Sequence, residues 1–287
     1  MVQGAMCVTL GALIFGFVPS GYKYAMLHGV SPSGMTCYSF SVMAILGVLA
    51  ALIRRKSLQV SPAQFIYLML LGMIGIGGTT FLLACAITLI PVGIATMIQF
   101  MYPSVVTLVM AAIFHERLTN KKIFALMISI VGMALISDLG TGSISLKGIL
   151  FALCASFTYA FYFISNERSI ISDLPLLIKL TYSGFGCALL FGAFTVYNQE
   201  LQFPNTKLSM AIMLLSCVGN MVAYYLIAAG IRFIGASRAA AIDMMEPVFS
   251  VIFSTLIYHD KLTVLMVCGI GLIFFSVLIT TFGKKEA

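Results

Sequence analysis

A seven-residue string occurs twice in this sequence, as IFHERLT at residues 113–119 and as IYHDKLT at residues 257–263. The two copies lie 144 positions apart, about half of the 287 residues. Sliding the chain against itself by that offset extends the match without gaps, so that Gly4 meets Gly148. A period of this length indicates one duplicated unit rather than a solenoid of short repeats.

Composition places the duplicated unit in a membrane. Hydrophobic residues make up 61% of the chain and charged residues 9%, which leaves too few polar groups to cover a water-soluble globule. The apolar stretches are continuous rather than alternating, a pattern that predicts helices and not barrel strands. Most are near the ~20 residues that cross a bilayer. Ten can be read, at roughly 4–27, 34–53, 64–89, 93–114, 120–138, 147–166, 176–197, 208–231, 235–258 and 262–282.

Five predicted helices per repeat have a geometric consequence. After an odd number of crossings, the second repeat (residues 144–287) enters the membrane from the side opposite to the first (residues 1–143). The predicted fold class is therefore an all-α integral membrane protein with ten transmembrane helices, arranged as two inverted five-helix repeats. Inverted repeats suit alternating access, because exchanging the conformations of the halves reopens a midplane site on the other side.

The charges orient the chain. Most of the 16 lysines and arginines fall on the side of the amino terminus, so the positive-inside rule predicts cytoplasmic N- and C-termini in a bacterial cytoplasmic (inner) membrane. The net charge of +7 therefore indicates no nucleic-acid partner. The seven cysteines are scattered without Cys-x-x-Cys spacing, which argues against a disulfide framework and a metal site. No cofactor is predicted.

Two of the nine acids, Asp243 and Glu246, sit deep in a predicted span. A charge at mid-bilayer costs from ~2.5 to more than 10 kcal/mol, so such acids face a wet cavity, pair, or stay protonated. Their i,i+3 spacing predicts one shared helix face. We interpret one of the two acids as the binding site of a proton or another coupling ion. The structural alternative is that Glu246 hydrogen-bonds neighbouring backbone and supports the kink at Pro247.

Pro247 lacks an amide hydrogen, so the carbonyl of Asp243 loses its helical partner, and Pro103 does the same to the carbonyl of Gln99. These residues are repeat equivalents, and transporters tolerate such broken backbone where it lines a cavity. The predicted central site is lined by Gln99, Tyr102, Asp243 and Glu246.

Four further residues are candidates for the same site, each with a structural alternative. Lys23 either binds a carboxylate or extends to the outer interface. Tyr159 and Tyr224 either stack on a ligand or pack between helices. Asn220 either binds substrate or joins helices through hydrogen bonds.

The segments MYPSVVTLVMAAIFHERLT (101–119) and MMEPVFSVIFSTLIYHDKLT (244–263) resemble the proline-containing helix and the following turn of the EamA branch of the drug/metabolite transporter superfamily. IFGFVPSGYKYAMLHGVSP (14–32) resembles its first helix. The resemblance covers the whole chain. It implies a gradient-coupled transporter, chiefly an exporter, of a small amino-acid-like or amphipathic metabolite.

Other function classes fit less well. His115-Glu116 begins an H-E-x-x-H zinc motif, but Thr119 stands where the second His is needed, so a membrane-embedded enzyme is not favoured. No filter loop or ring of charges indicates a channel, and a non-transporting scaffold remains an alternative. No P-loop is present, so the chain has no ATPase of its own. The expected partners are a small-molecule substrate and the lipid bilayer, with a monomer as the simplest state.

The repeated string itself is predicted to be a turn between two helices, with Thr119 or Thr263 capping the next helix. The alternative is a gating role, in which its acid pairs across a closed face. The two copies are expected on opposite faces of the membrane, so they share no active site.

Overall fold

A computed structural model of the protein describes residues 2–55, 57–87, 89–90, 92–136, 145–258 and 263–282. Every regular element within these ranges is helical. In chain order they are α1 (Val2–Leu27), α2 (Pro32–Ile53), α3 (Pro62–Leu70), the π-helical η1 (Leu71–Gly77), α4 (Gly78–Ile87), α5 (Val92–Gln99), α6 (Tyr102–Ala112), α7 (Asn120–Ile136), α8 (Leu146–Arg168), α9 (Leu176–Tyr197), α10 (Lys207–Ile234), α11 (Ala236–Asp243), α12 (Glu246–Tyr258) and α13 (Val264–Phe282).

The chain is an integral membrane protein. Within the described residues, seven helical stretches are long and apolar enough to cross a bilayer. Five are the single helices α1, α2, α8, α9 and α10, and two are the composite stretches Pro62–Leu83 and Ile94–Ala112. A shorter apolar helix covers Val264–Ile279 in α13. The predicted number of ten spans therefore stays a prediction.

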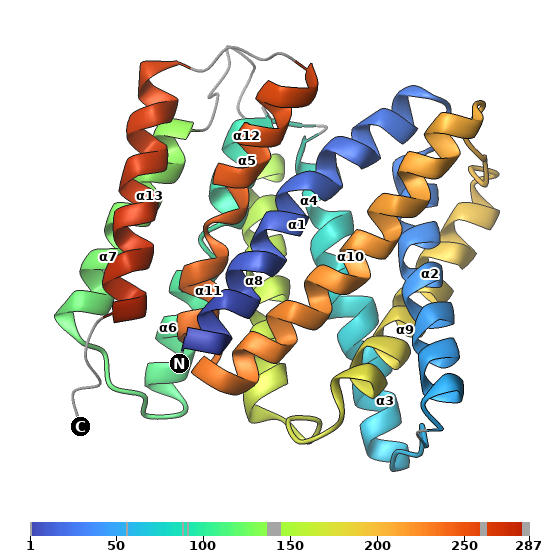
Figure 1. The fold of residues 1–287 in the computed structure, drawn as a ribbon, viewed down its shortest axis with the longest axis horizontal. Helices are drawn as coiled ribbons and strands as arrows, with labels where there is room; N and C mark the ends of the chain where they lie inside the picture. Colours follow the sequence, from blue (N-terminus) through green and yellow to red (C-terminus); the bar gives the residue numbers. More distant parts are fainter. Residues whose placement is uncertain are drawn as a thin grey trace.

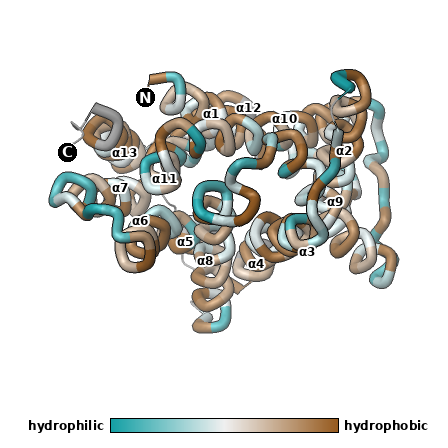
Figure 2. Tube along the Cα trace, turned by 90° about the horizontal axis from the view of Figure 1, so that it is seen from below, coloured by the Kyte–Doolittle hydropathy of each residue, from teal (hydrophilic) through white to brown (hydrophobic). Residues whose placement is uncertain are grey.

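The helices lie in two rows (Figures 1 and 2). One row contains α1, α10 and α12, and the other contains α5, α8 and α4. The pair α7 and α13 closes one end of the molecule, and α2 and α9 close the other. The start of α1 and the described end of α13 both lie at the lower face in Figure 1.

The principal packing partners are unchanged when the two halves of the chain are exchanged. α1 packs on α10, and its repeat equivalent α8 packs on α4. α1 also contacts α12 and α11, while α8 contacts their equivalents α6 and α5. The pairs α2–α9 and α7–α13 each join a helix to its own equivalent. This is the contact pattern that a two-fold axis produces.

The contacts of two equivalent glycines show the same exchange of partners between the halves. A Cβ atom added to Gly4 would lie 2.6 Å from Cγ2 of Ile234. A Cβ atom added to Gly148 would lie 2.7 Å from Cγ2 of Ile90. Gly148 is the equivalent of Gly4, and Ile234 is the equivalent of Ile90. The same helix crossing therefore occurs twice, and each half of the chain supplies the glycine in one of the two.

The α7–α13 pair is also closely packed, through small residues. A Cβ atom added to Gly269 would lie 2.5 Å from the carbonyl oxygen of Gly132. The hydroxyls of Ser129 and Ser276 lie 2.5 Å apart, in hydrogen-bond contact. Small residues of this kind let helix backbones approach within a membrane.

The stretch at 64–89, predicted as one helix, is divided into α3, η1 and α4. The π-helical part contains Gly72, where a Cβ atom would lie 2.0 Å from the carbonyl oxygen of Ser183. A side chain at this position would collide with the backbone of α9, so glycine is needed for the approach. Gly72 thus permits close packing of η1 on α9.

The first copy of the repeated string forms the turn between α6 and α7. His115 has φ 55°, in the left-handed region, which reverses the chain after α6. Thr119 Oγ1 accepts a hydrogen bond of 3.3 Å from the Lys122 amide, and Thr263 Oγ1 accepts one of 3.2 Å from the Met266 amide. Both predicted caps are confirmed. Residues 259–262 of the second copy lie outside the described residues.

Candidate functional site

Two helical stretches are interrupted at equivalent positions of the repeat. α5 ends at Gln99 and α6 begins at Tyr102, while α11 ends at Asp243 and α12 begins at Glu246. Because the interruption falls between Asp243 and Glu246, the two acids belong to different helices. Asp243 therefore lies at a helix end, and the shared face predicted for the two acids stays a prediction.

The carboxyl group of Asp243 is the centre of the candidate site. Its side chain is 0% exposed, and Oδ2 accepts a hydrogen bond of 2.6 Å from the Tyr102 hydroxyl. A second, longer contact of 3.4 Å comes from the hydroxyl of Tyr159. Oδ1 has no hydrogen-bond partner among the described residues. A buried carboxylate oxygen without a donor is costly, so this atom is suited to bind a proton, a metal cation or a ligand amine.

Aromatic rings extend from this carboxyl group towards α10. The rings of Tyr102 and Tyr159 have centroids 4.6 Å apart, and Tyr159 stacks on Tyr162 at 6.1 Å. Tyr162 meets Tyr224 edge-on at 5.4 Å, and Tyr224 meets Phe15 at 4.8 Å. These buried rings form a continuous wall from α6 through α8 and α10 to α1.

The other predicted site residues have different positions. Gln99 is buried at the end of α5, but none of the described hydrogen bonds joins it to Asp243. Glu246 is half-buried and lies close enough to Asp243 to interact with it electrostatically. Asn220 is buried on α10, and its Nδ2 has no partner within the described part of the chain. The side chain of Lys23 lies outside the described part.

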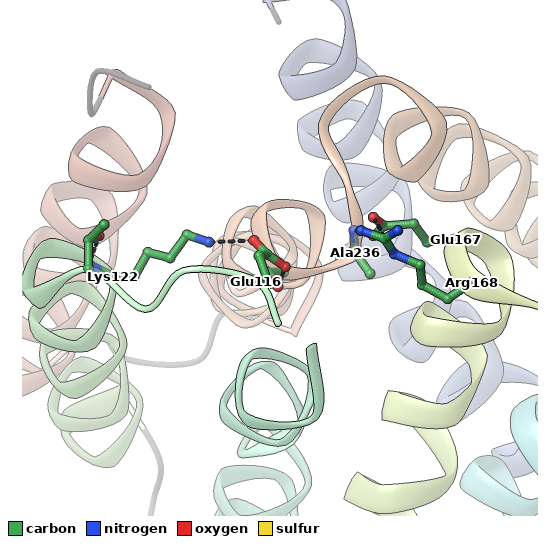
Figure 3. A network of polar contacts seen from close by, with 7 residues as sticks. Glu116, Lys122, Glu167, Arg168 and Ala236 are labelled. Carbon is green, nitrogen blue, oxygen red and sulfur yellow. Dashed lines mark hydrogen bonds and ion pairs between the residues drawn. The ribbon is translucent and has the colours of Figure 1, made fainter. Parts of the chain in front are cut away.

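A second polar cluster lies at the lower face and holds the start of α11 (Figure 3). Glu116, in the turn after α6, forms an ion pair of 2.5 Å with Lys122. Its other oxygen accepts a hydrogen bond of 2.8 Å from the hydroxyl of Ser237. Glu167, near the end of α8, accepts a hydrogen bond from the Ala236 amide.

Both glutamates therefore sit at the amino terminus of α11, where the helix dipole favours negative charge. Arg168 contacts Glu167 at 3.3 Å and lies 5.6 Å from the ring centroid of Phe114. The cluster joins the first half of the chain, through Glu116, to the second half. It fixes the same helix that ends at Asp243.

Sequence reasoning did not assign a role at this site to Phe163. Its side chain is buried, and its ring centroid lies 5.2 Å from that of Tyr102. The available signal was the run TYAFYF at residues 158–163, which also fits ordinary helix packing.

The described residues contain no group of three or more His, Cys, Asp or Glu side chains that could hold a metal ion.

Comparison with known proteins gives a consistent result. The model of the EamA-like transporter family matches residues 2–138 and 146–282. The uncharacterized transporter YdfC of Bacillus subtilis is 24% identical over 94% of this chain and 86% of its own length. The uncharacterized transporter sll1319 of Synechocystis is 27% identical over 71% of this chain and 63% of its own length. A crystal structure shares the fold, with a TM-score of 0.85, 16% identity and 99% of both chains covered.

Proposed function

The chain belongs to the EamA-like transporter family, and from this premise we propose that it is a secondary-active exporter of a small amino-acid-like or amphipathic compound. The proposed mechanism is alternating access around the site at Asp243, with a proton or another cation as the coupling ion. The proposed location is the bacterial cytoplasmic membrane, with both termini in the cytoplasm, on the distribution of basic residues described above.

One observation carries this proposal: the buried carboxyl group of Asp243 has one oxygen held by Tyr102 of the other half and one oxygen without a described partner. A group that binds and releases a cation needs such a free acceptor. It also needs a way to sense the conformation of both halves, which the hydrogen bond from Tyr102 supplies.

We propose ten membrane crossings in two inverted repeats, residues 1–143 and 144–287. The exchange of helix partners between halves supports this arrangement, as do the reciprocal contacts of Gly4 and Gly148. Rocking of one half against the other would then open the site to each side in turn.

The wall of the site supports the proposed substrate class. Tyr159, Tyr162 and Tyr224 offer aromatic faces, with a carboxyl group at the Asp243 end. This combination suits a compound with an apolar body and an amine, because aromatic faces and a carboxylate both attract a cationic group.

The cluster in Figure 3 is proposed to close the cytoplasmic side. Glu116 and Ser237 come from different halves and lie 2.8 Å apart, so separating the halves at this face must break their hydrogen bond. The interaction is partly exposed, and one hydrogen bond to a charged group contributes about 1.5–3 kcal/mol before screening. Such a contact can be broken and remade during a transport cycle.

The test is transport into proteoliposomes driven by an imposed ion gradient, using a compound first found by thermal-shift screening at two pH values. Asp243→Asn keeps the size of the side chain and removes its charge, and we expect it to abolish gradient-driven transport. Asp173→Asn makes the same chemical change at an exposed loop residue and is expected to leave transport unchanged. Gradient-driven transport by the Asp243→Asn protein at the normal rate would refute the coupling role of Asp243.

A further inference from the structure

A cavity of about 510 Å³ lies between α2, α9 and α10, away from the site at Asp243. Its lining includes Arg54, Leu177, Met221, Val222 and Arg232. Arg54 follows the last residue of α2, and Arg232 is in the last turn of α10. Met221 precedes Arg232 by eleven positions, or roughly 16 Å along a helix at 1.5 Å per residue. The cavity thus has a basic end at the membrane face and an apolar end within the membrane.

The basic end carries uncompensated positive charge. Neither Arg54 nor Arg232 has an ion pair with an acid among the described residues, and the lining contains no Asp or Glu. Lys179, which is 2% exposed, is near enough to Arg232 to interact with it electrostatically. Asp173 is the acid that interacts with Lys179.

Lys179 has its own hydrogen-bond partners. Its Nζ donates to the carbonyl oxygens of Asn166, at 3.2 Å, and Ser172, at 2.9 Å. It therefore contributes positive potential to the cavity while two of its three N–H donors bind backbone carbonyl groups elsewhere. The two guanidinium groups remain to bind an anion.

We propose that this cavity binds one anionic phospholipid of the adjacent leaflet. Arg54 and Arg232 bind its phosphate, since the planar guanidinium group matches phosphate geometry. The upper part of one acyl chain lies along Leu177, Met221 and Val222. Val222 is 41% exposed, so the apolar end is open to the bilayer. Basic pockets between transmembrane helices are suited to lipid headgroups, and this site does not depend on the substrate or direction of transport.

The first experiment measures the melting temperature of purified protein in detergent as lipid is added. Dioleoyl phosphatidylglycerol should raise it with saturation, because a ligand that binds only the folded state stabilises it by mass action. Dioleoyl phosphatidylcholine and water-soluble glycerol 3-phosphate should not raise it over the same concentrations. Equal stabilisation by phosphatidylcholine would overturn the charge argument, and equal stabilisation by glycerol 3-phosphate would overturn the lipid assignment.

Variants locate the site. Arg54→Gln and Arg232→Gln should each weaken the phosphatidylglycerol effect roughly tenfold in apparent affinity, as loss of one charge-assisted contact predicts. Arg55→Gln is the matched control, since it removes the same charge one residue away and Arg55 does not line the cavity. Val222→Trp, which fills the apolar end without changing charge, should also weaken binding. The melting transition of each variant without lipid reports whether it folds. If Arg55→Gln weakens binding as much as Arg54→Gln, the proposal is wrong.

Discussion

Removing the hydroxyl group of Tyr102 tests the central site most directly. The Tyr102→Phe protein keeps the ring and loses the 2.6 Å hydrogen bond to Asp243, in surroundings where both side chains are 0% exposed. A hydrogen bond to a charged group is worth about 1.5–3 kcal/mol. If the transport cycle passes through the ionised carboxylate, the loss should lower the transport rate roughly 10- to 150-fold.

Tyr159→Phe provides the matched comparison, because Tyr159 is also buried and also donates to Oδ2 of Asp243. Its contact of 3.4 Å is longer than a normal O–H···O hydrogen bond. We therefore expect its loss to slow transport less than about threefold, a cost well below that of one full hydrogen bond. The assay is the initial rate of counterflow in proteoliposomes at equal amounts of reconstituted protein. Equal effects of the two variants, or a larger effect of Tyr159→Phe, would refute the role of the short hydrogen bond.

Two further predictions concern helix packing and the lower face. Gly269→Ala should lower the melting temperature in detergent, because the added Cβ would lie 2.5 Å from the carbonyl oxygen of Gly132. The control is Gly271→Ala on the same helix, where an added Cβ would have nothing within 4 Å and the melting temperature should not change. Equal losses in the two variants would contradict the packing argument. Ser237→Ala removes the 2.8 Å hydrogen bond to Glu116. It should speed labelling of a cysteine introduced at buried Ala240 by a thiol reagent, in a chain with the exposed Cys154 and Cys268 replaced by Ser. The control is Ser57→Ala, at an exposed loop position, and an unchanged labelling rate in the Ser237→Ala protein would count against the gate.

The repeat and the prolines were readable from the sequence because both are local or periodic signals. The offset of 144 predicts which residues are equivalent, and Pro103 and Pro247 point to the same places where α5 and α11 end. The family and the integral membrane class were also predicted correctly, since composition and motif suffice for both. Neither the repeat nor the prolines indicate where a side chain points after a helix has been interrupted.

The remaining features depend on contacts between distant segments. Glu167 reaches the amide of Ala236, 69 positions later, and nothing near Glu167 in the sequence indicates this. In the sequence Lys179 has the pattern of an ordinary basic residue of the cytoplasmic side, yet the chain folds back so that two backbone carbonyl groups accept hydrogen bonds from it. The position of Tyr162 between Tyr159 and Tyr224 likewise depends on how α8 packs against α10.

The packing of α1 on α10 and of α8 on α4 has a consequence for biosynthesis. These pairs, together with α2–α9 and α7–α13, all join one half of the chain to the other, so the first half leaves the ribosome without its principal packing partners. Each early helix must persist in the bilayer as an independent unit until the late helices arrive, as the two-stage view of membrane insertion allows. A fragment ending before α8 would therefore insert but would remain unassembled, a ready substrate for membrane quality-control proteases.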